Sequence, residues 1–221
     1  QRLMTVYRTI GCEYDKNAKG CSMCDFAFYA SPDIKEKNIV AQHRQSLETL
    51  RNADFIHFDL LTLGNFYNDR EISANVRETL LKSLAEVKGV KRVLTEARRQ
   101  YVTVDKLKEA RGYLREDQTL EFALGYETVN SDLRNRVLRK GTPEHHLDES
   151  LEMCKESGVD FVSYVLIKPH TLTEREGIEE AVNTAVHVLG KAEDYGVNTR
   201  IAFEPVFVTK GKVIEELWKR G

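Results

Sequence analysis

The sequence predicts an α/β fold, a partial (β/α)6 TIM barrel in which six parallel strands form an open three-quarter barrel. Apolar runs of strand length alternate six times with segments of helical spacing, without a linker or a break in composition. Such alternation favours a parallel sheet with right-handed crossovers. Six units are too few for the closed eight-stranded barrel. A doubly wound open sheet is the alternative fold, although no Gly-x-Gly-x-x-Gly follows the first strand. We expect residues 1–221 to form a single domain.

The expected strands are short runs rich in β-branched and aromatic residues. They cover residues 2–10, 54–63, 91–97, 120–126, 160–167 and 198–206. The expected helices lie between and after them, at residues 39–50, 72–87, 104–114, 132–138, 145–157, 173–195 and 213–219. Gly158 is placed to end one helix, and Thr173 with Glu176 has the spacing of a capping box that begins the longest one.

The composition indicates a globular protein without a strong charge bias. The chain has 221 residues, of which 41% are hydrophobic, and its 33 basic and 35 acidic residues give a net charge of −2. Domains that bind nucleic acid by bulk electrostatics are usually strongly basic, so the composition argues against that class. A local basic groove remains open, around Arg134, Arg136, Arg139 and Lys140. With no signal peptide and no apolar run that could span a bilayer, we expect a cytoplasmic protein without a membrane partner.

Three of the four cysteines stand close together in the loop after the first strand. These loop cysteines are Cys12, Cys21 and Cys24. In a reducing compartment they favour metal binding over disulfides, and Gly11 and Gly20 would let the loop fold back tightly. Three thiolates suit a [4Fe–4S] cluster with one open iron better than a closed four-ligand site. A zinc site completed by a distant residue and three unrelated thiols are the alternatives. Cys154 is expected to be a buried helical thiol.

Several residues, most of them polar, are expected beside this loop, because the carboxyl ends of parallel strands meet at one end of the sheet. They are Gly64, Asn65, Glu96, Glu127, Lys168 and Glu204. Each also has a simpler interpretation, such as a solvated carboxylate at a strand end or, for Asn65, a residue that caps a turn.

The Cys-x8-Cys-x2-Cys loop after the first strand of a six-unit βα domain resembles the radical S-adenosylmethionine (radical SAM) superfamily. The commonest spacing there is Cys-x3-Cys-x2-Cys, and Met23 stands where an aromatic residue is common. Residues 62–66, 95–98 and 124–128 resemble strand-end motifs of the elongator- and coproporphyrinogen-dehydrogenase-like branch. Within the superfamily, residues 8–12, 20–24, 64–66, 166–174 and 216–220 are similar to the radical SAM subunits of archaeosine synthases. Asp25 and the Phe-Ala-Phe after it depart from the glycine and tyrosine of that pattern.

The resemblance implies two cofactors and a set of contacts to them. The loop cysteines would bind a [4Fe–4S] cluster, whose open iron would chelate S-adenosylmethionine (SAM), and residues 1–221 would be a radical SAM core domain. Glu127 would bind the SAM ribose, Gly64 and Asn65 would lie near its methionine end, and Glu96 and Arg98 would reach SAM. Glu204 is a weaker cofactor-binding candidate, and Lys168 is the candidate catalytic residue of the pocket. Arg98 could equally be a surface residue.

The implied activity is generation of a 5′-deoxyadenosyl radical, in tRNA modification of the archaeosine type. The substrate would be a lysine adduct of a 7-deazaguanine base already in tRNA, cleaved by radical chemistry. A partner subunit would carry most of the tRNA contacts, and ferredoxin or flavodoxin would be the reductant. Two other functions stay open: a radical SAM enzyme for a free small molecule or another macromolecule, and a non-catalytic iron–sulfur or zinc module.

Overall fold

Six parallel strands form one curved sheet in the computed structural model, which describes residues 1–18, 20–50 and 53–220. The strands are β1 (Arg2–Tyr7), β2 (Ile56–Thr62), β3 (Val90–Glu96), β4 (Thr119–Glu127), β5 (Asp160–Ile167) and β6 (Thr199–Pro205). Each strand pairs in parallel with the next one in the chain, so the order runs from β1 to β6. A doubly wound sheet would reverse its strand order, so this order confirms the predicted open partial barrel.

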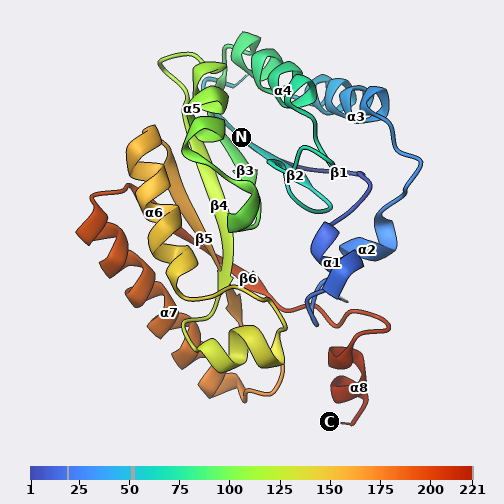
Figure 1. Cartoon of the computed structure of the whole chain (residues 1–221), viewed down its shortest axis with the longest axis vertical. Helices are drawn as coiled ribbons and strands as arrows, with labels where there is room; N and C mark the ends of the chain where they lie inside the picture. Colours follow the sequence, from blue (N-terminus) through green and yellow to red (C-terminus); the bar gives the residue numbers. More distant parts are fainter. Residues whose placement is uncertain (19, 51–52, 221) are drawn as a thin grey trace.

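Five helices cover one face of the sheet (Figure 1). They are α3 (Glu36–Glu48), α4 (Ala74–Glu86), α5 (Val104–Gly112), α6 (His145–Ser157) and α7 (Glu174–Tyr195). Three further helices lie apart from that row, at lower right in Figure 1: α1 (Glu13–Ala18), α2 (Phe26–Tyr29) and α8 (Val213–Arg220). None of the helices in the described ranges has the length and apolar character needed to cross a membrane.

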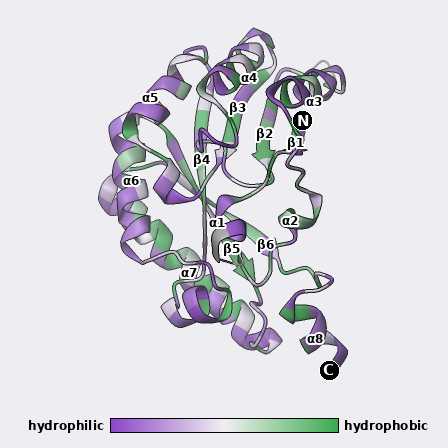
Figure 2. Ribbon diagram, turned by 45° about the vertical axis from the view of Figure 1, so that its right-hand side comes forward, coloured by the Kyte–Doolittle hydropathy of each residue, from purple (hydrophilic) through white to green (hydrophobic). Residues whose placement is uncertain are grey.

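The core lies between the sheet and the row of helices. Phe58, Phe122 and Phe161 of the strands are fully buried there, and Cys154 of α6 packs in the same cluster, as predicted for a helical thiol. The opposite face of the strands carries a smaller apolar cluster inside the barrel, made of Leu61, Leu94, Ala123 and Val162. Figure 2 shows the apolar strands enclosed by helices whose outer surfaces are polar. Burial on both faces explains why the strands are nearly continuous apolar runs.

Local sequence signals predicted the boundaries of several helices and strands correctly. The predicted helix 145–157 and strand 160–167 coincide with α6 and β5, and Gly158 ends α6 with a left-handed φ of 66°. Thr173 and Glu176 form the predicted capping box of α7. The predicted helix 132–138 is a single π-helical turn, η2 (Leu133–Val137). Helices α1 and α2 and the 3-10 turn η1 (Arg99–Tyr101) were not predicted, because they are too short to show apolar periodicity.

The amino-terminal end of the barrel is occupied by a charged network centred on Glu121 of β4. Its carboxylate, 1% exposed, lies 2.8 Å from the guanidinium groups of Arg92 and Arg200 and 2.9 Å from His57 Nε2. Burial alone would raise the pKa of Glu121, but the hydrogen bonds and positive charges around it outweigh burial and hold that pKa below its ordinary value. These side chains line a cavity of about 360 Å³ at the end opposite the loop cysteines.

Candidate functional site

A pocket of about 420 Å³ opens at the carboxyl ends of the strands. It is lined by all three loop cysteines and by most of the other predicted site residues. Those residues are Gly64, Glu96, Arg98, Glu127 and Glu204. Residues that are far apart in the sequence, from Arg2 to Glu204, therefore line the same pocket because the sheet is curved. Asn65 and Lys168 are not among the residues that line it.

The cysteine loop is held by its own turns and by the chain after β4. Gly11 and Gly20 both adopt left-handed conformations, with φ of 84° and 65°, as expected for residues that let the loop fold back. A Cβ at Gly11 would lie 2.5 Å from Ala30 Cβ, so the backbone requires glycine there. Ser22 donates its backbone N–H to Leu138 O at 2.9 Å and its hydroxyl to Val137 O at 2.8 Å. The loop is thereby tied to η2.

The three loop thiols line one pocket. They do not all lie within 4.8 Å of one another, because within the described ranges the only group of three or more potential ligand atoms at that spacing is His145, His146 and Glu149. Three thiols in one pocket fit the ligand set of a [4Fe–4S] cluster with one open iron.

Burial makes two of the loop thiols poor anions by themselves. It raises the pKa of Cys24 to about 11 and also raises the pKa of Cys21. A thiol must lose its proton to bind a metal, and a metal cation provides the charge that drives this loss. Cys21 and Cys24 are consequently suited to a bound metal rather than to nucleophilic chemistry as free thiolates.

Glu127 and Lys140 form an ion pair in the wall of the pocket. Glu127, the last residue of β4, has a left-handed φ of 71°, and its Oε1 lies 2.5 Å from Lys140 Nζ. Burial opposes the charge on Lys140, but Glu127 outweighs it and holds the pKa of Lys140 above its ordinary value. A Cβ at Gly125 would meet both charged groups, so a larger residue there would have to displace the ion pair. Lys140 was not predicted as a cofactor-site residue, although it belongs to the local basic groove that the sequence left open.

Two further carboxyl groups face the same pocket. Burial raises the pKa of Glu96 to about 8, and Tyr164 of β5, which hydrogen-bonds Glu96, only partly offsets this effect. Burial also raises the pKa of Glu204. Burial therefore favours the protonated form of both carboxyl groups. Tyr164 lines the pocket but was not predicted, because an aromatic residue in an apolar strand gives no signal of a site.

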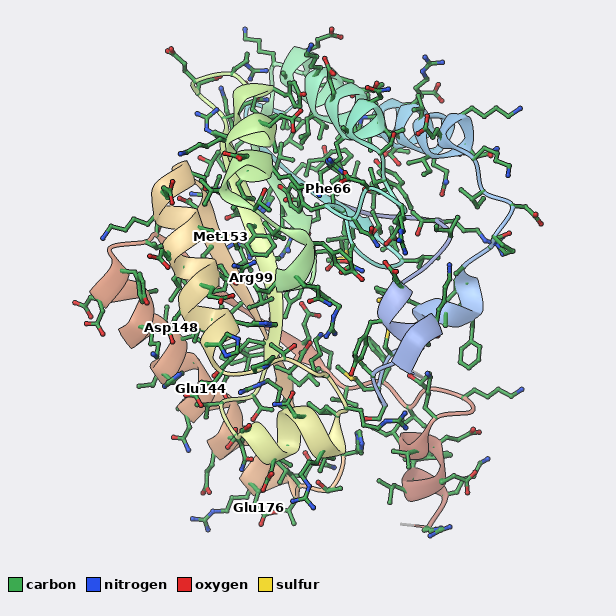
Figure 3. The ribbon with its side chains drawn as sticks, in the orientation of Figure 1. Phe66, Arg99, Glu144, Asp148, Met153 and Glu176 are labelled. Carbon is green, nitrogen blue, oxygen red and sulfur yellow. The ribbon has the colours of Figure 1, made fainter. Side chains whose placement is uncertain are left out.

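Arg98 braces the pocket wall. Its guanidinium carbon lies 3.8 Å from the centre of the Tyr14 ring, and its Nη2 donates to the carbonyl oxygens of Lys140 and Gly141 at 2.7 and 3.0 Å. Arg98 therefore joins α1, the end of β3 and the loop after η2. Arg99, its neighbour, points instead to α6, where it pairs with Glu149 at 2.9 Å (Figure 3).

The structure does not bring Lys168 into the pocket. Lys168 follows β5 with a left-handed φ of 56°, its side chain is 44% exposed, and it is ion-paired with Glu174 in the first turn of α7. The turn that joins β5 to α7 directs this side chain toward the helix, which the sequence could not indicate. The place of Lys168 between an apolar strand and a proline thus has a structural explanation, and its catalytic role remains a prediction without support from this geometry.

Asn65 lies behind the pocket wall. It is fully buried, its Nδ2 is 3.6 Å from Cys12 Sγ, and its Oδ1 accepts the backbone N–H of Arg98 at 2.8 Å. Its direct neighbour is thus a loop cysteine rather than the open space of the pocket.

Comparison with known proteins finds relatives that match 99% of this chain, whereas no family model matches it. The chain is 33% identical over 224 residues to an uncharacterized protein of Methanocaldococcus jannaschii, covering 99% of this chain and 59% of that protein. It is 27% identical to the archaeosine synthase beta subunits of Methanosarcina acetivorans and Thermococcus kodakarensis, covering 99% of this chain and 61% and 66% of those proteins. The chain thus spans about three-fifths to two-thirds of the length of these relatives.

A solved structure shares the fold. It is TsrM from Kitasatospora setae, a radical SAM methyltransferase with tryptophan and a SAM analogue bound. It matches with a TM-score of 0.50 and 13% identity over 92% of this chain and 35% of that one. The resemblance expected from the motifs is confirmed: the chain is similar over almost its whole length to archaeosine synthase beta subunits, and its fold is similar to that of a radical SAM methyltransferase.

Proposed function

We propose that this chain is a radical SAM enzyme that acts in archaeosine formation, with residues 1–221 as a single radical SAM core domain. One observation carries the proposal: the three loop cysteines share a pocket with Glu96, Glu127 and Glu204 at the carboxyl ends of six parallel strands. Thiols for a cluster and polar groups for a charged cofactor are thus available side by side. The similarity to archaeosine synthase beta subunits supports the same assignment.

The residues divide into ligands and cofactor contacts. The loop cysteines would hold a [4Fe–4S] cluster, which together with SAM supplies a 5′-deoxyadenosyl radical when both are bound. Glu127 would accept hydrogen bonds from the SAM ribose, with Lys140 holding its carboxylate in place. Gly64, Glu96, Arg98 and Glu204 line the remaining wall. Apolar strand side chains inside the barrel would exclude water from the reacting atoms.

The proposed substrate is a lysine adduct of a 7-deazaguanine base in tRNA, cleaved in its lysine part. The net charge of −2 gives little attraction for a polyanion such as tRNA. A tRNA-binding partner subunit is therefore part of the proposal, in keeping with relatives that are named as subunits. Ferredoxin or flavodoxin would supply the electron.

The test is the yield of 5′-deoxyadenosine from SAM after anaerobic reconstitution and reduction with dithionite. Cys21→Ala removes a proposed ligand, whereas Cys154→Ala removes the one cysteine outside the loop and serves as the matched control. We expect product from the wild type and from Cys154→Ala, and none from Cys21→Ala. A wild-type chain that binds a cluster but yields no 5′-deoxyadenosine would favour a non-catalytic iron–sulfur module. Addition of the partner subunit and adduct-bearing tRNA then tests the substrate.

A further inference from the structure

One buried side chain contacts a predicted cluster ligand from behind the pocket. Asn65 follows Gly64 in the turn after β2, is 0% exposed, and places its Nδ2 3.6 Å from Cys12 Sγ. Because sulfur is larger than oxygen, this distance is that of a hydrogen bond. No other side-chain donor to a loop cysteine is found among the residues that the structure describes.

The orientation of this amide is fixed by its second partner. The backbone N–H of Arg98 lies 2.8 Å from the other end of the Asn65 side chain, and an N–H can only donate. The atom near Arg98 must therefore be the oxygen, so the atom near Cys12 must be the NH2 group. The contact is thus a donor aimed at a sulfur, not an acceptor.

A buried carboxylate holds the turn in this position. Glu71, 5% exposed, accepts the backbone N–H of Asn65 at 2.6 Å and the hydroxyl of Thr9 at 2.6 Å. Thr9 lies between β1 and Cys12, so Glu71 joins the two segments that carry the donor and the sulfur. A Cβ at Gly64 would clash with the Glu71 carboxylate, which accounts for the glycine. The Asn65–Cys12 contact is consequently built by three buried polar groups.

We propose that Asn65 is a positioning residue of the cluster site that raises the reduction potential of the cluster bound through Cys12. This inference rests on the proposed function. A donor that faces a thiolate sulfur draws electron density from it, and so favours the cluster after it has gained one electron. Hydrogen bonds to the sulfur ligands are among the factors that set the potentials of such clusters.

Two variants separate the donor from the rest of the side chain. Asn65→Asp keeps an oxygen for the Arg98 N–H but replaces the donor with an acceptor of negative charge. Asn65→Leu removes the donor without adding charge. Asn130→Asp is the matched control, since Asn130 uses its side-chain oxygen to accept the backbone N–H groups of Asp132 and Leu133.

The measurement is the midpoint potential of the reconstituted full chain, followed by electron paramagnetic resonance and normalised to bound iron and sulfide. We expect a more negative potential in both Asn65 variants, with the larger shift in Asn65→Asp, and no shift in Asn130→Asp. Unshifted potentials in both Asn65 variants would overturn the inference. Loss of the cluster from both of them would also count against it, because a residue that only tunes the potential is not needed for assembly.

The same experiment keeps the two proposals apart. A wild-type chain that assembles no cluster overturns the proposed function and this inference together. A wild-type chain that assembles the cluster and forms 5′-deoxyadenosine, with unshifted Asn65 variants, overturns this inference alone.

Discussion

The Glu127–Lys140 ion pair is a buried polar contact in the wall of the candidate site. Both side chains are largely buried, with exposures of 7% and 15%, and Glu127 adopts a backbone conformation that is rare outside glycine. Conformations of this kind persist only where the surroundings dictate them, and they concentrate at functional sites. The pair therefore links the end of β4 to the chain after η2 and fixes the place of the carboxylate.

Removal of Lys140 should destabilise the protein far more than removal of a surface lysine. Lys140→Met leaves the Glu127 carboxylate buried without its cation, which costs about 3 kcal/mol or more of the free energy of unfolding. Lys82→Met breaks an exposed pair with Glu78 on α4 and should cost about 0.5 kcal/mol or less. Denaturant titrations of both variants measure the difference. Equal losses of stability would contradict this account of the pair.

At the scale of single residues, the sequence indicated which residue types form the candidate site but not which of them contact one another. Cysteines, glutamates and glycines at strand ends could be recognised, because strand order alone brings such ends together. The Glu127–Lys140 and Asn65–Cys12 contacts could not, since each joins segments whose approach depends on loop conformation. Lys168 shows the converse: a residue of the expected type at a strand end turns to a helix instead.

Helix α7 illustrates how a single element is fitted to the sheet. It is 22 residues long, begins at the Thr173 capping box and ends at Gly196, which has a left-handed φ of 69°. Its first turn lies so close to the end of β5 that Gly177 contacts the backbone of Lys168. Gly190, farther along the same helix, has open space around its Cα. Two glycines of one helix thus have opposite roles.

The same substitution at these two glycines should change stability in opposite directions. A Cβ at position 177 would lie 2.7 Å from Lys168 Cα, so Gly177→Ala must move backbone and should cost about 1–3 kcal/mol. Gly190→Ala meets no atom within 4 Å and should stabilise the helix by about 0.5–1 kcal/mol. Unfolding curves of the two variants provide the test. A change of stability of the same sign in both variants would contradict this account of the two glycines of α7.

Elements of ordinary length were predictable because periodicity and capping agree over many residues. Helix α6 and strand β5 are the clearest cases. Helix α1, with the sequence EYDKNA, has no apolar stripe, so only its tertiary surroundings make it helical. The π-helical turn η2 read as a normal helix, because sequence spacing does not distinguish the two over five residues.

At the scale of the whole molecule, the charged network at the amino-terminal end of the barrel connects several strands. Glu121 of β4 contacts His57 of β2, Arg92 of β3 and Arg200 of β6, so one carboxylate joins four strands. Sheet hydrogen bonds connect neighbouring strands only, whereas this network crosses the interior of the barrel. Glu121 therefore connects strands that are not neighbours in the sheet.

Glu121→Gln should therefore destabilise the whole fold and change its response to acid. Loss of the buried charge leaves two arginines without their shared partner, at a cost of about 3–5 kcal/mol at pH 7. The folded-state pKa of Glu121 lies below its ordinary value of 4.5, so its stabilisation is complete above that pH and is lost as pH falls through the folded-state pKa. Between pH 7 and pH 3, the free energy of unfolding should fall less in Glu121→Gln than in the wild type. An identical fall in both would be evidence against the network.

The sheet that surrounds the pocket has two ends that do not meet. Within the described residues the ladder runs from β1 to β6 without a hydrogen-bonded seam between them, although Met4 and Val6 of β1 and Glu204 of β6 line the same pocket. In a closed barrel, strand number and stagger determine a single diameter. In this open barrel the strand-to-strand hydrogen bonds do not by themselves determine one diameter, so the distance between β1 and β6 across the pocket depends on side chains and loops.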